Sequence, residues 1–132
     1  MSVSDPIADF LNHLKTASQV KKPFIVTPYS RMKEEIAKIL TKEGFVEYYS
    51  IVDEGVKKKI MVHLRYGDNG IPAITGVKKV SRPGTFFYVK KEEIPRVKSG
   101  FGIAIISTSQ GLKTDKECRK LGIGGKVICY IW

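Results

Sequence analysis

The spacing of apolar residues changes about halfway along this chain, and that change constrains its fold more than any other feature. In residues 4–18 and again in residues 30–44, apolar side chains recur at the three- and four-residue intervals of an amphipathic helix. Each segment begins with a helix-capping residue, and the second ends at a glycine. Beyond about residue 72 the helical spacing is lost, except in residues 114–121. The sequence therefore predicts a helix-containing first half and a second half built mainly of strands.

Strand-like segments supply the rest of the predicted fold. In the first half, residues 24–26 form one such segment, and residues 45–52 and 57–66 flank the hairpin sequence Asp53–Glu54–Gly55. Four segments of the second half have the same character: residues 74–80, 85–89, 102–107 and 126–132. They are separated by turn residues rather than by long helices, which favours antiparallel pairing.

A turn-rich stretch at residues 67–72 separates the two halves. We therefore predict an N-terminal domain over residues 1–66 and a C-terminal domain over residues 67–132. The predicted fold class is α+β: a small N-terminal α/β domain with two helices and a three-stranded sheet, followed by a mostly antiparallel β domain with one short helix. That helix begins at Thr114, which forms a capping box with Glu117.

The charge of the chain is strongly positive and unevenly distributed. The formal net charge is +10. Residues 1–66 hold 11 Lys and Arg against 8 Asp and Glu, whereas residues 67–132 hold 12 against 5. A basic C-terminal half points to a polyanionic partner, most often a nucleic acid and less often an anionic membrane surface. The chain lacks a basic amphipathic helix, so we expect no membrane partner.

Composition also indicates the compartment. The sequence opens with no charged segment followed by an apolar core, so no secretory signal is expected. It contains no apolar run near 18 residues, so no membrane span is expected. Two cysteines are too few for a disulfide framework. We therefore expect a reduced, cytoplasmic protein.

Residues that could carry catalysis are scattered. His13 and His63 lie on different predicted elements, with no Cys or carboxylate at metal-ligand spacing. Cys118 has no evident base partner. Residues 122–126 are similar to a phosphate-binding loop, but they lack its first glycine and are followed by Val127 where Ser or Thr is required. We expect no catalytic residue, no metal and no cofactor.

One segment of the second half is suited to close contact with a ligand. The apolar run Ile103–Ile106 is followed by the three hydroxyl residues Ser107, Thr108 and Ser109, and then by Gly111. This pattern predicts a buried strand that ends in a hydroxyl-rich loop without large side chains. Such a loop can exchange hydrogen bonds with phosphates, 2′-hydroxyls and base edges.

A second segment combines cations with aromatic residues. Basic side chains surround a turn at residues 81–84, which leads into the aromatic run Phe86–Phe87–Tyr88. Cations beside aromatic rings suit RNA, because the phosphates take the charge and exposed bases stack on the rings. Alternatively, some of these rings pack within the sheet, an outcome less expected for Tyr88, whose hydroxyl needs a polar partner. The basic residues concerned are Lys78, Lys79, Arg82, Lys90 and Lys91.

Several motifs occur together in a fixed order along the whole chain. They are residues 4–9, 81–84, 100–104, 107–111 and 124–132, which read SDPIAD, SRPG, GFGIA, STSQG and GGKVICYIW. In this order they resemble the bacterial form of the small-subunit ribosomal protein eight family. The resemblance implies a two-domain protein that binds the central domain of small-subunit rRNA directly, early in assembly. It further implies that in some bacteria the protein represses its own operon by binding an mRNA that mimics the rRNA site.

The resemblance also implies which residues contact RNA. The reading loop would consist of Ser107, Thr108, Ser109 and Gly111, with Tyr88 and the turn Gly124–Gly125 beside it. A second rRNA helix would touch the N-terminal helices through Asp5, Lys15, Ser30, Arg31 and Lys33. The basic residues Lys78, Lys79, Arg82, Lys113 and Lys126 complete the predicted set.

Two positions in the second half depart from the family pattern, in which arginine is frequent where Phe86 stands and glutamate is usual where Lys126 stands.

The overall prediction is a non-enzymatic constituent of the small ribosomal subunit, whose partners are rRNA, neighbouring ribosomal proteins and, in some bacteria, its own mRNA. The alternative is a small basic enzyme that processes or modifies RNA. It would need a convergent acid–base pair, and the second half offers only Asp68, Glu92, Glu93, Asp115 and Glu117.

Overall fold

The computed structural model describes residues 5–82 and 84–132. The described chain forms two compact units. One contains residues 5–8 with Gly76–Trp132, and the other is Asp9–Thr75. The described residues form three α-helices and two antiparallel sheets, which is the α+β fold that the sequence predicted. The division into functional domains at residues 66 and 67 stays a prediction.

The Asp9–Thr75 unit is built on a three-stranded antiparallel sheet. Its strands are β1 (Phe24–Pro28), β2 (Val46–Glu54) and β3 (Lys57–Leu64), in the order β1-β3-β2. The predicted hairpin joins β2 to β3 through residues 55 and 56, and Gly55 has a φ of 79° there. Glycine adopts this left-handed conformation without the steric cost that other residues meet.

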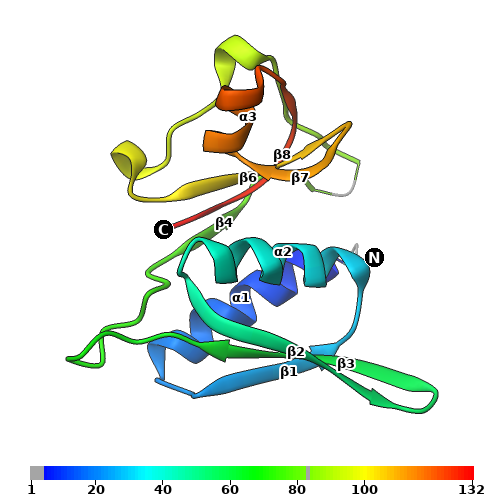
Figure 1. Ribbon diagram of the computed structural model, residues 1–132, viewed down its shortest axis with the longest axis vertical. Coiled ribbons are helices and arrows are strands. Elements are labelled where there is room, and N and C mark those ends of the chain that lie inside the picture. The colour runs from blue at the N-terminus through cyan, green and yellow to red at the C-terminus, as the bar shows by residue number, and fades with distance from the viewer. Residues whose placement is uncertain (1–4, 83) are drawn as a thin grey trace. The chain divides into compact units, whose positions relative to one another are not determined.

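Two capped helices cover one face of this sheet. Helix α1 (Pro6–Gln19) starts after Asp5, whose carboxylate accepts the Ala8 N–H at 3.1 Å. Helix α2 (Arg31–Lys42) starts after Ser30, whose hydroxyl accepts the Lys33 N–H at 3.2 Å. Both helices lie above the sheet in Figure 1. Their apolar residues bury a core against the inward residues of the strands: Phe10, Leu11, Leu14, Ile36, Leu40, Ile25, Ile60 and Val62.

The C-terminal unit is a five-stranded antiparallel sheet. Its main path is β4 (Val77–Lys79), β8 (Gly125–Ile131), β6 (Ile103–Thr108) and β7 (Gly111–Thr114). The short strand β5 (Tyr88–Val89) pairs with the start of β8. Strand β8 is therefore central, because β4 and β5 pair along one side of it and β6 along the other.

The short helix α3 (Asp115–Leu121) lies against β6, β7 and β8 (Figure 1). The predicted capping box is confirmed, since Thr114 Oγ1 accepts the Glu117 N–H and Glu117 Oε1 accepts the Thr114 N–H. The Asp115 carboxylate is fully buried and binds both the Ala104 N–H and the Arg119 guanidinium. Beneath α3 lies a core of buried side chains: Val89, Val97, Ala104, Ile106, Cys118 and Val127.

The structure corrects three details of the predicted C-terminal half. Residues 107–111 are a tight hairpin rather than a loop, because Ser107 and Thr108 are the last residues of β6 and Gly111 begins β7. The segment predicted as a strand over 74–80 is paired as a strand only at Val77–Lys79, and the one over 85–89 only at Tyr88–Val89. Two short 3₁₀ turns, Lys91–Glu93 and Lys98–Gly100, had no counterpart in the prediction.

Candidate nucleic-acid interface

Three of the predicted RNA contacts form one row across the C-terminal sheet. The register places Tyr88 of β5 opposite Lys126 of β8, and Lys126 opposite Ser107 of β6. Residues directly opposite one another in antiparallel strands point to the same face of the sheet. A ring, an ammonium group and a hydroxyl are therefore neighbours on one face, although they come from three separate parts of the sequence.

Two glycines allow the strands of this row to come together. A Cβ atom on Gly125 would lie 2.2 Å from the Ser107 carbonyl oxygen, and one on Gly124 would lie 2.2 Å from the Val89 carbonyl oxygen. Contacts this short with backbone atoms cannot be relieved by moving a side chain. Gly124 and Gly125 therefore hold β8 close to both of its neighbours, and their role in this surface is one of positioning.

The hydroxyl residues at the end of β6 have different roles. Thr108 Oγ1 donates to the Gly111 carbonyl oxygen at 2.7 Å and accepts the Gln110 N–H at 3.1 Å, so its hydroxyl closes the hairpin turn. The hydroxyls of Ser107 and Ser109 bind no residue in the described part of the chain. Ser107 is half-buried and Ser109 is exposed. These two serines are available to a ligand, and Thr108 fixes the turn that presents them.

The aromatic run lies at the surface rather than inside the sheet. Phe86 is 54% exposed, Phe87 49% and Tyr88 68%. The Lys126 ammonium lies 4.2 Å from the centre of the Phe86 ring, and the Phe86 and Tyr88 rings meet edge to face at 6.3 Å. Phe86 thus joins the row through Lys126, a contact that the sequence did not predict because the two residues lie on different segments.

The other basic residues of this unit divide into two groups. Lys78 is opposite Tyr130 and Lys113 is opposite Ile106, so both belong to the face of the sheet that α3 covers. Arg82 is exposed in a turn in which its backbone pairs with that of Thr85. The intervening Pro83 lies outside the described residues. The positive charge is therefore spread over more than one face rather than concentrated at the row.

Lys79 and Asp5 are bound to each other. The Lys79 ammonium lies 3.3 Å from Asp5 Oδ2 and also donates to the Ser81 carbonyl oxygen. The Lys79 side chain is only 15% exposed and that of Asp5 only 20%. Because Asp5 also caps α1, this pair has a structural role within its own unit.

The remaining predicted contacts lie on the helices of the Asp9–Thr75 unit. Ser30 caps α2, and the Lys33 ammonium is buried, where it donates to Thr27 Oγ1 and the Pro28 carbonyl oxygen. Burial lowers the pKa of Lys33. Lys15 is half-buried, and the side chain of Arg31 is 89% exposed. Of these four residues, Lys15 and Arg31 are the ones whose charge is accessible to a phosphate.

Three of the five carboxylates of the second half have structural partners. Glu93 accepts the Lys90 N–H in a 3₁₀ turn, Glu117 completes the cap of α3, and Asp115 binds Arg119. Burial raises the pKa of Cys129 to about 12, and that of Cys118 is also raised. Thiols in such surroundings stay protonated near neutral pH and are poor nucleophiles. Residues 5–82 and 84–132 contain no group of three side chains that could hold a metal ion.

Comparison with known proteins decides the family. Residues 5–132 match the family described as ribosomal protein S8. The chain belongs to the ribosomal protein S8 family. The small ribosomal subunit protein uS8 of Dictyoglomus thermophilum is 52% identical to it, that of Alkaliphilus oremlandii 50% and that of Caldicellulosiruptor bescii 49%. In each case the similarity covers the whole of both chains.

Membership of the S8 family confirms several predictions made from the sequence. The chain is a small-subunit ribosomal protein, and the family is structural rather than enzymatic. The alternative of an RNA-processing or RNA-modifying enzyme is therefore wrong. The predicted localisation at the ribosome is also confirmed. No helix among the described residues is both long and apolar enough to cross a membrane.

Proposed function

We propose that this S8 protein binds the central domain of small-subunit rRNA directly, and that the row of Tyr88, Lys126 and Ser107 is the centre of its contact. The observation that carries the proposal is the register, which aligns these three residues on adjacent strands of one sheet face. An exposed ring suits base stacking, an ammonium group suits a phosphate, and a free hydroxyl suits a 2′-hydroxyl or a base edge.

The hairpin turn extends this surface beyond the row. Ser109 stands in the turn directly after Ser107 and Thr108, and its hydroxyl is unbonded within the described chain. Gly111 carries no side chain and is exposed, so a backbone of RNA can approach the turn closely. Arg31 and Lys15 would supply phosphate contacts from the other unit, to a second rRNA helix.

Direct binding to folded rRNA supports two further parts of the proposal. A protein that binds rRNA without help from others stabilises the RNA fold on which later proteins assemble. An mRNA that presents the same arrangement of bases and phosphates would compete for the same surface, and binding to it would repress translation of the protein's own operon. Both roles depend on the same row of residues.

The test is a pair of serine substitutions. Hydrogen bonds from side-chain hydroxyls contribute roughly 0.5–1.5 kcal/mol each, so changing both Ser107 and Ser109 to alanine should weaken binding to a central-domain rRNA fragment on the order of tenfold or more. The melting temperature should not change, because neither hydroxyl has a partner in the described chain. Thr108→Val is the contrasting variant, since it removes the two hydrogen bonds that close the turn and should lower the melting temperature.

Binding of the double serine variant at the wild-type affinity would contradict the proposal. The same titration with an unrelated RNA measures how much of the affinity is specific. The mRNA of the protein's own operon should compete with the rRNA fragment for wild-type protein, and should compete less well once both serines are replaced.

A further inference from the structure

The sheet of the Asp9–Thr75 unit has one face that its own helices leave open. Helices α1 and α2 lie on the face that contains the buried residues Ile25, Ile60 and Val62 (Figure 1). Residues of the opposite face follow from the register. They form three rows across β1, β3 and β2: Phe24, His63 and Tyr48; Val26, Met61 and Ser50; Pro28, Lys59 and Val52.

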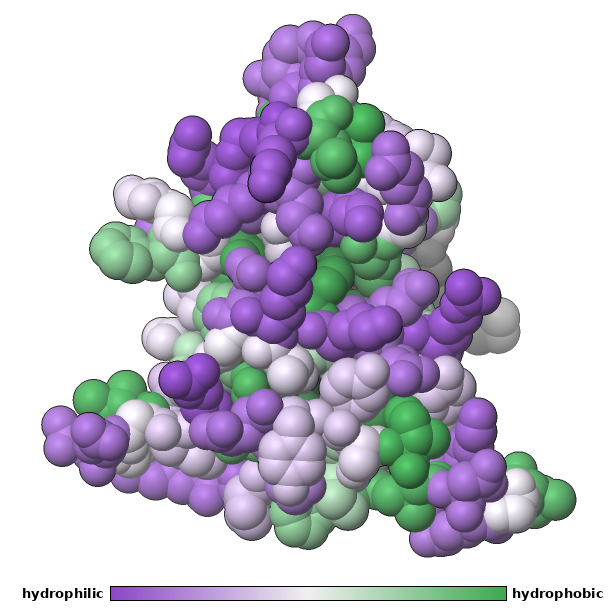
Figure 2. All heavy atoms as spheres, viewed as in Figure 1, coloured by the Kyte–Doolittle hydropathy of each residue, from purple (hydrophilic) through white to green (hydrophobic). Residues whose placement is uncertain are grey.

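This open face is unusually apolar for a sheet surface in contact with water. A sheet with one solvated face normally alternates between apolar residues inside and polar residues outside. Here most of the outward positions are aromatic or aliphatic, and Phe24 is 40% exposed, Val26 38% and Tyr48 52%. Figure 2 shows this unit from the side, with hydrophobic residues interspersed among hydrophilic ones along the sheet. A contiguous exposed apolar surface of this kind marks an interaction site.

The aromatic row is better suited to a protein than to RNA. The Tyr48 and His63 rings stack on each other at 4.1 Å with an angle of 17° between their planes, and Phe24 lies 5.5 Å from His63. Stacking within the row occupies ring faces that a base would need. The next row contributes Val26 and Met61, whose aliphatic side chains offer neither hydrogen bonds to bases nor charge to phosphates.

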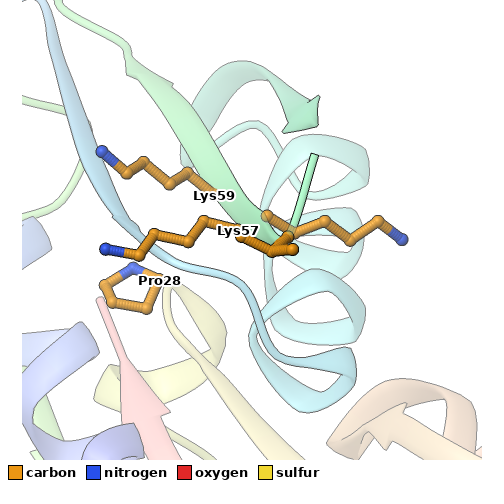
Figure 3. Close-up of a pocket in the computed structure, with 5 residues that line it drawn as sticks. Pro28, Lys57 and Lys59 are labelled. Atoms are coloured by element: carbon orange, nitrogen blue, oxygen red, sulfur yellow. The ribbon is translucent and has the colours of Figure 1, made fainter. Parts of the chain in front are cut away.

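At the tip of the β2–β3 hairpin, the open face carries basic side chains. A cavity of about 460 Å³ is lined by Pro28, Val56 and the lysines 57–59 at the tip of the β2–β3 hairpin. Lys57 and Lys59 point to the same side of the strand, beside Pro28 (Figure 3). Neither has a carboxylate at ion-pair distance in the part of the chain that the structure describes. Val56, next to them, is fully exposed.

We propose that this open face is the docking surface for another protein of the small ribosomal subunit. The partner would place apolar side chains on Val26, Met61 and Tyr48, and an acidic residue between Lys57 and Lys59. The lysines lie at one end of the apolar rows, so charge complementarity also sets the direction in which the partner lies. The inference rests on the proposed function of assembly into the subunit, but it uses a different surface from the RNA contacts.

A photo-reactive side chain placed on this face identifies what covers it. Tyr48 is replaced by p-benzoylphenylalanine in the full chain, and small subunits assembled in cells are irradiated. The expected result is a cross-link to one small-subunit protein, at a peptide with apolar residues beside Asp or Glu. Ile71 is the matched control, since it is 65% exposed in the same unit but lies outside the sheet. A cross-link from residue 48 to rRNA, or none in assembled subunits, would overturn the proposal.

Substitutions then test the chemistry with the purified partner that the cross-link identifies. Val26→Asp, and separately the pair Lys57→Glu and Lys59→Glu, should each weaken binding to it on the order of tenfold or more. Val20→Asp, at a position that is 62% exposed outside the sheet, should leave binding unchanged. The lysine pair lies at the surface and decides the outcome if Val26→Asp fails to fold. Wild-type affinity in the folded lysine variant would overturn the proposal.

Measuring the affinity of these variants for the rRNA fragment shows whether they affect only the docking surface or also the proposed RNA contact. All of these variants should bind the fragment as tightly as the wild type, because none of the changed residues belongs to the row in the C-terminal unit. If wild-type protein fails to bind the fragment, the proposed RNA contact is wrong, whereas the cross-link from residue 48 still tests the docking surface.

Discussion

At Tyr88 the proposed RNA contact can be tested separately from folding. Its ring is 68% exposed, so removing the ring takes little from the core. We expect Tyr88→Ala to weaken binding to the central-domain rRNA fragment by about 1–3 kcal/mol, the contribution of one base stacked on an aromatic ring. Tyr88→Phe should weaken it less, because the stacking face is kept. Titration of both variants, with thermal melts of each, checks this prediction.

Phe101 provides the matched control for Tyr88. It is an aromatic residue of the same unit and is 88% exposed, but it is not part of the row. Phe101→Ala should leave affinity for the fragment unchanged. Equal losses in Tyr88→Ala and Tyr88→Phe would instead assign the contact to the phenolic hydroxyl. A lowered melting temperature in both would show that the ring packs in the fold.

The sequence predicts helix caps better than it predicts the binding partners of charged side chains. The spacing of Ser30 and of Thr114 identified two helix starts, because a cap is a local hydrogen bond between residues three apart. Lys33 was predicted as an RNA contact from the family resemblance, and Lys79 from the basic residues around the aromatic run. In the structure Lys33 is buried against Thr27, and Lys79 binds Asp5. A lysine reaches several ångströms beyond its backbone, so its partner depends on the folded chain and not on its neighbours in sequence.

Among the elements, β8 is the one on which the candidate RNA surface depends most. It lies between β5 and β6, and Gly125 is the point at which it approaches β6. A methyl group there would meet the Ser107 carbonyl oxygen at 2.2 Å. We expect Gly125→Ala to lower the free energy of unfolding by about 1–3 kcal/mol, the usual cost of overpacking. Chemical denaturation monitored by circular dichroism measures this change.

Gly67→Ala is the control for this substitution. A Cβ atom on Gly67 would lie 3.7 Å from the Ile71 carbonyl oxygen, an ordinary van der Waals distance. This variant should be neutral or slightly stabilising, because alanine restricts the unfolded chain. A Gly125→Ala protein as stable as wild type would show that the strands can separate at this point, and that glycine is not needed to position the row.

The strands also show where prediction from sequence stops. The apolar runs that became β6 and β8 were recognised because both are largely buried on both faces, and buried strands are continuously apolar. Strand β7 was missed because its four residues, Gly111–Thr114, are polar or small apart from Leu112. Its pairing comes from the hairpin turn that Thr108 closes, and such pairing leaves no periodic pattern. The row of Tyr88, Lys126 and Ser107 likewise depends on register between distant segments.

The chain has a net charge of +10, so the proposed RNA binding combines general attraction to phosphates with contacts that distinguish one RNA from another. The structure places Lys78 and Lys113 on the sheet face that α3 covers, and Arg82 in an exposed turn. The serines at the end of β6 stand apart from these charges. Phosphate contacts are independent of base sequence and release counterions, whereas hydroxyl contacts can distinguish one RNA from another.

This division predicts opposite responses to salt. Changing Lys78, Arg82 and Lys113 to glutamine should weaken binding to cognate and unrelated RNA alike. For every phosphate that the variant no longer binds, the slope of log affinity against log salt should become shallower by about 0.7–0.9. The Ser107→Ala, Ser109→Ala variant should keep the wild-type slope but lose its preference for the cognate RNA. Titrations of both variants against both RNAs, at several salt concentrations, measure slope and preference together.

Lys79→Gln tests whether the slope reports phosphate contacts rather than total charge. It removes one positive charge, as each of the other substitutions does, but Lys79 is bound to Asp5 and is only 15% exposed. Losing the pair should lower the melting temperature and leave the salt slope as in wild type. If Lys79→Gln flattens the slope as much as Lys78→Gln does, the slope follows net charge. If the lysine and arginine changes abolish preference for cognate RNA while the serine changes do not, specificity comes from a basic surface matched to RNA shape.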